Sequence, residues 1–223
     1  MSPNHFRGFP PTTRSFLTRH GETPEHAWDG STRAEYATVM LAPLKALCRD
    51  LAERLPAIGP RIVAEPRVGA SLWGAEGIGA PACRIRFWDA DLGRERSPWI
   101  FVNVTSEGIE IGAVDQDPRG SGAGRLRSAL LPHRPLRAHV AGLAASGWRI
   151  SGTPLPDAGD GAVPDDLRAW MIGSQLRVSL LLDWADWTGE PGLVDEIADR
   201  LREIVPVFDA MRGADLRVGS TTA

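Results

Sequence analysis

The sequence predicts an α+β fold, in which an antiparallel meander of four to five strands is packed by N-terminal and C-terminal helices. Apolar residues recur at helical spacing from Tyr36 to Leu55, alternate with a period of two from Ile62 to Val114, and return to helical spacing after Leu193. Helices and strands therefore come in separate blocks. This order argues against alternating βαβ units and so against the usual nucleotide-binding folds.

The composition is that of an ordinary globular protein of 223 residues, 43% of them hydrophobic and 24% charged. No apolar run reaches the roughly 20 residues of a membrane span, and the first ten residues lack the pattern of a signal peptide, so we expect a cytoplasmic protein. A net charge of -3 argues against nucleic acid as a partner. The basic residues are Arg except Lys45, which indicates a GC-rich genome and leads us to expect a bacterial source.

Two helices are expected in the first part of the chain. Prolines before residues 12–17 indicate a short opening helix. Thr32, followed three residues later by Glu35, is a capping-box signature, so the second helix is expected to begin there and to run to Pro56. Pro43 lies inside this second helix and must kink or split it, because proline lacks a backbone donor and clashes with the preceding turn.

The meander is expected to contain strands at 62–73, 83–89, 99–105 and 109–114. Ser106-Glu107-Gly108 would join the last two strands as a short hairpin. In the third strand, Ile100, Val102 and Val104 share one face, which we expect to be the core covered by helices. Trp99 and Asn103 share the opposite, mixed face, where a binding site is expected.

The second half is expected to hold a glycine-rich loop and then mostly helices. The predicted segments are a loop at 119–124, helices at 125–131 and 134–146, a strand at 148–152, a mobile loop at 153–164, and helices after it that end in an amphipathic helix from Leu193. We expect residues 1–212 to form one domain and residues 213–223 to form a flexible tail.

Several motifs, taken in order, resemble a known family. They are Phe6-x-Gly8-Phe9-Pro10, Phe16-Leu17, Trp28 with Arg33 and Tyr36, Pro43-Leu44, Arg84-Ile85-Arg86-Phe87 and Arg96-Ser97-Pro98-Trp99. This series resembles the family described as domain of unknown function 2461, over roughly Phe6 to Met211. The family pattern carries two lysines after its Arg-Phe pair, whereas this chain lacks both and has extra residues between Phe87 and Pro98. The resemblance implies no activity.

The best candidate binding residues lie on the second predicted strand. Arg84 and Arg86 leave the same face, where two planar guanidinium groups can bind a carboxylate or a phosphate. We expect Arg96 to hold negative charge with them, and Trp88 and Trp99 to form apolar walls. The alternative is structural: the two arginines form ion pairs, with Glu35 as one candidate partner, or lie on a solvated face.

A second candidate group comprises Trp28, Arg33 and Tyr36, the last two lying one helical turn apart. With its hydroxyl near Arg84 or Arg86, Tyr36 would be a proton donor or would orient a ligand. Asp89 is the second candidate for proton transfer. The alternative for Tyr36 is that it belongs to the core, with its hydroxyl satisfied by a neighbour.

Four other patterns in the sequence are weaker evidence for a functional site. The glycine loop before Arg125 and Arg127 is either an anion site at a helix end or a plain connector. The segment 183–187 pairs two carboxylates and two indoles but is typical of a helix end. The five histidines have no ligand spacing, so we expect neither metal nor cofactor. Cys48 and Cys83 are expected to be buried free thiols, too few for a disulfide framework.

Two functions remain open from the sequence. In the first, an Arg- and Trp-lined pocket binds a small acidic or aromatic metabolite. The protein would then be a cofactor-independent enzyme that converts this metabolite by proton transfer or by shaping its conformation. In the second, the chain is a non-catalytic interaction domain that contacts a protein through exposed Trp184, Trp187 and the loop 153–164.

Overall fold

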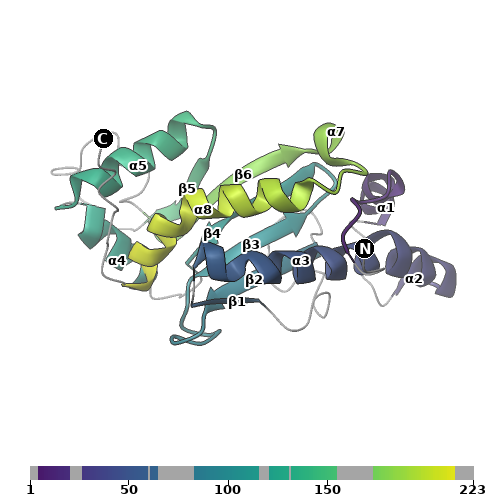
Figure 1. Cartoon of the computed structure of the whole chain (residues 1–223), viewed down its shortest axis with the longest axis horizontal. Coiled ribbons are helices and arrows are strands. Elements are labelled where there is room, and N and C mark those ends of the chain that lie inside the picture. The colour runs from purple at the N-terminus through teal and green to yellow at the C-terminus, as the bar shows by residue number, and fades with distance from the viewer. Residues whose placement is uncertain are drawn as a thin grey trace. The chain divides into compact units, whose positions relative to one another are not determined.

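The computed structural model describes residues 5–20, 27–59, 61–64, 83–115, 121–130, 132–154 and 173–213 (Figure 1). Its centre is a six-stranded antiparallel sheet with the strand order β1-β2-β3-β4-β6-β5, flanked by N-terminal and C-terminal helices, so the predicted α+β class is confirmed. The strands are β1 (Ile62–Ala64), β2 (Cys83–Asp89), β3 (Trp99–Val104), β4 (Gly108–Val114), β5 (Arg149–Pro154) and β6 (Gly173–Asp183).

The N-terminal helices are α1 (Thr12–His20), α2 (Gly30–Tyr36) and α3 (Ala42–Ile58), with a π-helical segment, η2 (Ala37–Leu41), between the last two. The predicted cap at Thr32 is wrong, because the side chain of Asp29 accepts the Thr32 backbone N–H and starts α2 earlier. The interruption predicted at Pro43 is present as η2. A wider turn there relieves the clash that a proline ring causes in a regular α-helix.

Contacts divide the chain into two compact units. Unit 1 comprises Met1–Phe87, Phe101–Ile111 and Leu181–Arg200, and unit 2 comprises Trp88–Ile100, Gly112–Leu180 and Leu201–Ala223. The long helix α8 (Leu193–Arg212) begins in unit 1 and ends in unit 2, which confirms the predicted final helix. Of the predicted tail, only Gly213 lies within the described residues.

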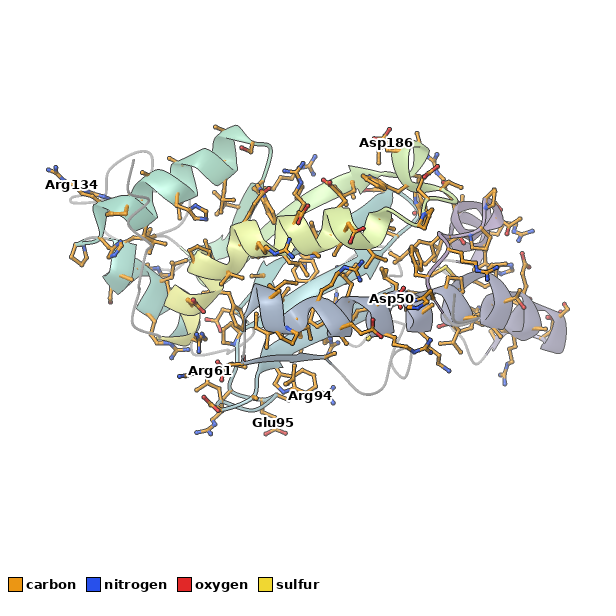
Figure 2. The ribbon with its side chains drawn as sticks, viewed as in Figure 1. Asp50, Arg61, Arg94, Glu95, Arg134 and Asp186 are labelled. Atoms are coloured by element: carbon orange, nitrogen blue, oxygen red, sulfur yellow. The ribbon has the colours of Figure 1, made fainter. Side chains whose placement is uncertain are left out.

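The core of unit 1 combines the buried face of α3 with alternate residues of the strands. In β2, Cys83, Ile85 and Phe87 are fully buried while the residues between them are half-buried, as a strand with one covered face requires. α3 packs beside β1 (Figure 1). Asp50 of α3, labelled in Figure 2, is buried and accepts the backbone N–H of Phe6, which fixes the N-terminal segment on this helix.

A short helix, α7 (Trp184–Trp187), closes unit 1 against the N-terminal segment. The indole N–H of Trp184 donates to the carbonyl of Thr105 over 2.8 Å, and its ring meets Phe9 edge-on at 5.8 Å. The Phe9 carbonyl accepts the N–H of Gly189, and a side chain at Gly8 would collide with the backbone of Gly189. Gly8, with φ +94°, is therefore required at this close approach.

Unit 2 contains α4 (Ser121–Leu130), α5 (Arg134–Ala145), strand β5 and the second half of α8. His139 of α5 bonds the carbonyl of Glu203 at 2.7 Å, and the indole N–H of Trp148 donates to the carboxylate of the same residue. β5 pairs with β6, with Arg149 opposite Ser179. Arg134, labelled in Figure 2, is exposed at the start of α5.

Two predictions for the second half are wrong. Residues 173–183, expected among the returning helices, form β6, in which the buried residues Leu176, Val178 and Leu182 follow the period of a strand. Residues 121–124, assigned to the glycine loop, form the first turn of α4. The predicted mobile loop lies almost entirely outside the described residues.

Candidate anion-binding sites

A chain of hydrogen bonds in unit 1 runs across three neighbouring strands. Nε of Arg84 on β2 donates to Oδ1 of Asn103 on β3 over 2.7 Å, and Nδ2 of Asn103 donates to Oε2 of Glu110 on β4 over 3.0 Å. Asn103 is only 2% exposed, so both ends of its amide need partners. The chain supplies them and fixes the orientation of the Arg84 side chain.

Arg86 lies on the same face of β2 as Arg84, because alternate residues of a strand point the same way. Both arginines are half-buried, as is Glu110. The described side chains here include two guanidinium groups and one carboxylate, a formal excess of one positive charge among these three residues. We call Arg84, Arg86, Asn103 and Glu110 the strand-face cluster. Its charge and its half-buried donors suit an anionic group.

The structure separates Tyr36 from these arginines. Its hydroxyl lies beside the thiol of Cys83, which projects from the opposite, buried face of β2. Burial raises the pKa of Cys83 to about 12, and the polar contact with Tyr36 lowers it by less. The expected approach of Tyr36 to Arg84 or Arg86 is therefore replaced by a contact with a neutral thiol.

Trp28 and Arg33 serve the same part of the core as Tyr36. The rings of Trp28 and Tyr36 lie 5.2 Å apart, and Phe16 meets Trp28 edge-on at 5.7 Å. Nε of Arg33 donates to the carbonyl of Trp28 over 3.2 Å. Glu35, considered as a partner for Arg84 or Arg86, instead pairs with Arg19 of α1. The N-terminal candidates thus hold helices together.

The remaining sequence candidates lie in unit 2, around the turn that follows β2. The carboxylate of Asp89 is 1% exposed; its Oδ1 accepts the backbone N–H groups of Asp91 and Leu92, and its Oδ2 accepts Nη1 of Arg212. Nε of Arg96 donates to the carbonyl of Leu92. The Asp89 carboxylate therefore holds the turn closed and anchors α8.

The two tryptophans of this region lie at the edges of the same turn. Trp88 is half-buried at the end of β2, and the indole N–H of Trp99 donates to the carbonyl of Arg94 over 2.9 Å. Figure 2 shows Arg94 and Glu95 at the outer end of this turn. Trp88, Asp89, Arg96 and Trp99 thus belong to unit 2, while the strand-face cluster belongs to unit 1.

A further charged group in unit 2 was missed by the sequence reasoning. Asp115, at the end of β4, is 2% exposed, and its backbone N–H donates to the carbonyl of Leu176. A methyl group on Gly122 would lie 2.7 to 2.9 Å from its carboxylate, so the carboxylate packs on the first turn of α4. The Asp115 carboxylate therefore lies at the helix end that the glycine segment suggested as an anion site. An Asp directly after a strand and before a glycine-rich segment is the signal that predicts such a helix-end carboxylate.

Among the described residues, no three His, Cys, Asp or Glu side chains gather in a way that could hold a metal ion. His133 accepts the backbone N–H of Leu136 and so caps α5, and both cysteines are buried thiols outside any disulfide, as predicted. No helix in the described part of the chain has the length and apolar character needed to cross a membrane.

Comparison with known proteins adds no relative. No family model matches the chain, and neither the curated proteins nor the solved structures contain a match. The resemblance to domain of unknown function 2461 therefore stays a prediction from the residue pattern.

Proposed function

We propose that this protein binds a small acidic metabolite through the strand-face cluster. The observation that carries the proposal is the hydrogen-bonded chain from Arg84 through buried Asn103 to Glu110, with Arg86 two residues further along the same face. An arginine held in one orientation loses less conformational entropy when it binds a carboxylate. The two guanidinium groups on one face favour a ligand that carries negative charge.

We propose binding rather than proton transfer by Tyr36 or Asp89. Both oxygens of the Asp89 carboxylate are already occupied by hydrogen-bond donors, one of them an arginine, and the group is buried. The Tyr36 hydroxyl lies beside a thiol whose pKa is about 12. A general acid or base must lie within hydrogen-bond reach of the proton that it moves; the Asp89 carboxylate is bonded to its own donors, and the Tyr36 hydroxyl lies on the buried face of β2, opposite to Arg84 and Arg86.

The interaction-domain alternative loses its main support. It needs exposed tryptophans on α7, but Trp184 is 2% exposed and its indole N–H is bonded to Thr105, while Trp187 is half-buried. A buried indole that holds two segments together contributes to the core and not to a docking surface. We also propose that the protein is cytoplasmic and bacterial and that it is a divergent member of the domain of unknown function 2461 family, on the sequence patterns described above.

Native mass spectrometry after incubation with a panel of mono- and dicarboxylic acids tests the proposal. The panel is measured on the wild type, on Arg86→Ala and on Arg14→Ala, which removes an exposed arginine of α1 in the same unit. We expect one acid to add its mass to the wild type and to Arg14→Ala but not to Arg86→Ala. The same adduct on all three proteins would contradict the proposal, as would no adduct on the wild type.

A further inference from the structure

Arg127 of α4, in unit 2, carries two buried and unsatisfied hydrogen-bond donors. Its Nε and Nη2 atoms are shielded from solvent and have no hydrogen-bond partner among the residues that the structure describes. These two nitrogens form one edge of the guanidinium, the edge that presents two parallel N–H groups. Donors on a charged group that are buried without an acceptor cost more free energy than neutral ones. An acceptor with two oxygens at the correct spacing would remove that cost.

The acidic group whose charge acts on Arg127 does not fill this role. The charge of Asp115 acts on Arg127 and opposes the lowering of its pKa by burial, yet neither Nε nor Nη2 bonds to that carboxylate. Asp115 is held elsewhere, because its backbone bonds to Leu176 and its side chain packs on Gly122. The first turn of α4 therefore has its counter-charge, whereas the edge of Arg127 has none bonded to it.

We propose that this edge of Arg127 binds the carboxylate group of a small ligand. A planar carboxylate accepts two parallel N–H bonds from a guanidinium, which matches the two unsatisfied donors. The Arg127 side chain as a whole is half-buried while Nε and Nη2 are shielded, so a ligand reaches this edge only when the atoms that cover it move aside. Asp115 selects the charge of the ligand: its repulsion is smaller for a carboxylate with one charge than for a phosphate with two.

The proposal uses other residues than the strand-face cluster, since Arg127 belongs to unit 2 and Arg84 and Arg86 belong to unit 1. Each proposal therefore fails or stands without the other. The site is also distinct from the phosphate-binding loop considered from the sequence. It depends on the guanidinium edge of Arg127 and not on the amide groups at the start of α4.

Proton–nitrogen NMR spectra of arginine side chains test the site directly. The Nε–H resonance of Arg127 is assigned by its absence in Arg127→Gln, and the protein is then titrated with acetate, with succinate and with inorganic phosphate at neutral pH. We expect a saturable shift of this resonance with the carboxylates and a smaller one with phosphate. Arg134→Gln, an exposed arginine on α5, serves as the control and should leave the response unchanged.

A conservative variant separates charge from geometry. Arg127→Lys keeps the positive charge but lacks the paired edge, so carboxylate binding should weaken by at least about tenfold. No shift of the Arg127 resonance with either carboxylate would overturn the proposal, as would a shift with phosphate alone. Unchanged carboxylate affinity in Arg127→Lys would also overturn the proposal. So would a spectrum of Asp115→Asn in which the Arg127 resonance has moved and added carboxylates have no effect, because Arg127 would then pair with Asp115 in solution.

Discussion

The carboxylate of Asp89 and the guanidinium of Arg212 form an ion pair within unit 2, with Oδ2 and Nη1 2.6 Å apart. Asp89 is 1% exposed and the Arg212 side chain 16%, so the pair is shielded from water. Burial lowers the pKa of Arg212, but the bonds and charges of Asp209 and Asp89 outweigh it, and the net shift is upward. The pair fastens the last turn of α8 to the end of β2.

Removing one member of this pair should destabilise the protein strongly. Asp89→Asn places an amide N–H or an uncharged oxygen against the Arg212 guanidinium, and breaking a buried pair in this way costs about 3 kcal/mol. Urea unfolding measures the change in the free energy of unfolding. The double variant Asp89→Asn with Arg212→Met should be more stable than the sum of the single variants predicts. A loss below about 0.5 kcal/mol in Asp89→Asn, the range of ordinary surface substitutions, would contradict the structural role.

Two glycines of α4 should respond oppositely to alanine. At Gly122 the added methyl group would meet the Asp115 carboxylate at under 3 Å, whereas at Gly124 nothing lies within 4 Å. Gly124→Ala should stabilise the helix by about 0.5 to 1 kcal/mol, because alanine loses less backbone entropy on folding. Gly122→Ala should lower the stability, since Asp115 must move. Thermal unfolding of both variants checks this, and equal shifts in melting temperature would contradict the contact.

The sequence patterns predicted the fold where periodicity was long and unbroken. The strands at 83–89 and 109–114 and the helix from Leu193 were placed within a residue of their observed limits. The strand β6 was missed although Leu176, Val178 and Leu182 keep the period of a strand, because the consecutive Leu180, Leu181 and Leu182 that end it are also compatible with a buried helix. Asp29 was missed as the cap of α2 because the capping-box pattern at Thr32 competed with it.

The candidate sites were less predictable, because they depend on partners far apart in the chain. Alternation along β2 was enough to place Arg84 and Arg86 on one face. It did not indicate that Asn103 and Glu110 would bond in line with Arg84, since that depends on the register of three strands. Nor did spacing show that Arg212, 123 residues after Asp89, would occupy its carboxylate.

The cap of α2 should make stability depend on acid pH. Hydrogen bonds from the Thr32 backbone N–H and the Ser31 hydroxyl lower the pKa of Asp29 to about 2 from its ordinary 3.8. A lowered pKa stabilises the folded state above pH 3.8, and the contribution disappears as the pH falls through about 2. The difference in melting temperature between wild type and Asp29→Ala should therefore shrink from pH 5 to pH 2. A difference that is constant across this range would rule out the cap.

The thiol of Cys83 should make stability depend on alkaline pH in the opposite sense. Its pKa rises from 9.0 to about 12, chiefly through burial, so the folded state keeps a proton that the unfolded chain releases above pH 9. The contribution is complete below pH 9 and is lost as the pH rises toward 12. At pH 10.5 the loss should reach about 2 kcal/mol, because each pH unit between the two pKa values changes the free energy of unfolding by about 1.4 kcal/mol.

The measurement is the free energy of unfolding of three proteins between pH 8 and pH 10.5. Cys83→Ala removes the titrating group, so its stability should fall less steeply than that of the wild type, although alanine leaves a small cavity and lowers the starting value. Cys48→Ala, which removes the other buried thiol, is the matched control and should keep the slope that Cys83 causes. Parallel plots of the free energy of unfolding against pH for all three proteins would contradict this prediction. The Cys83 thiol would then ionise equally well in the folded and unfolded states, and it would not be buried from water on β2.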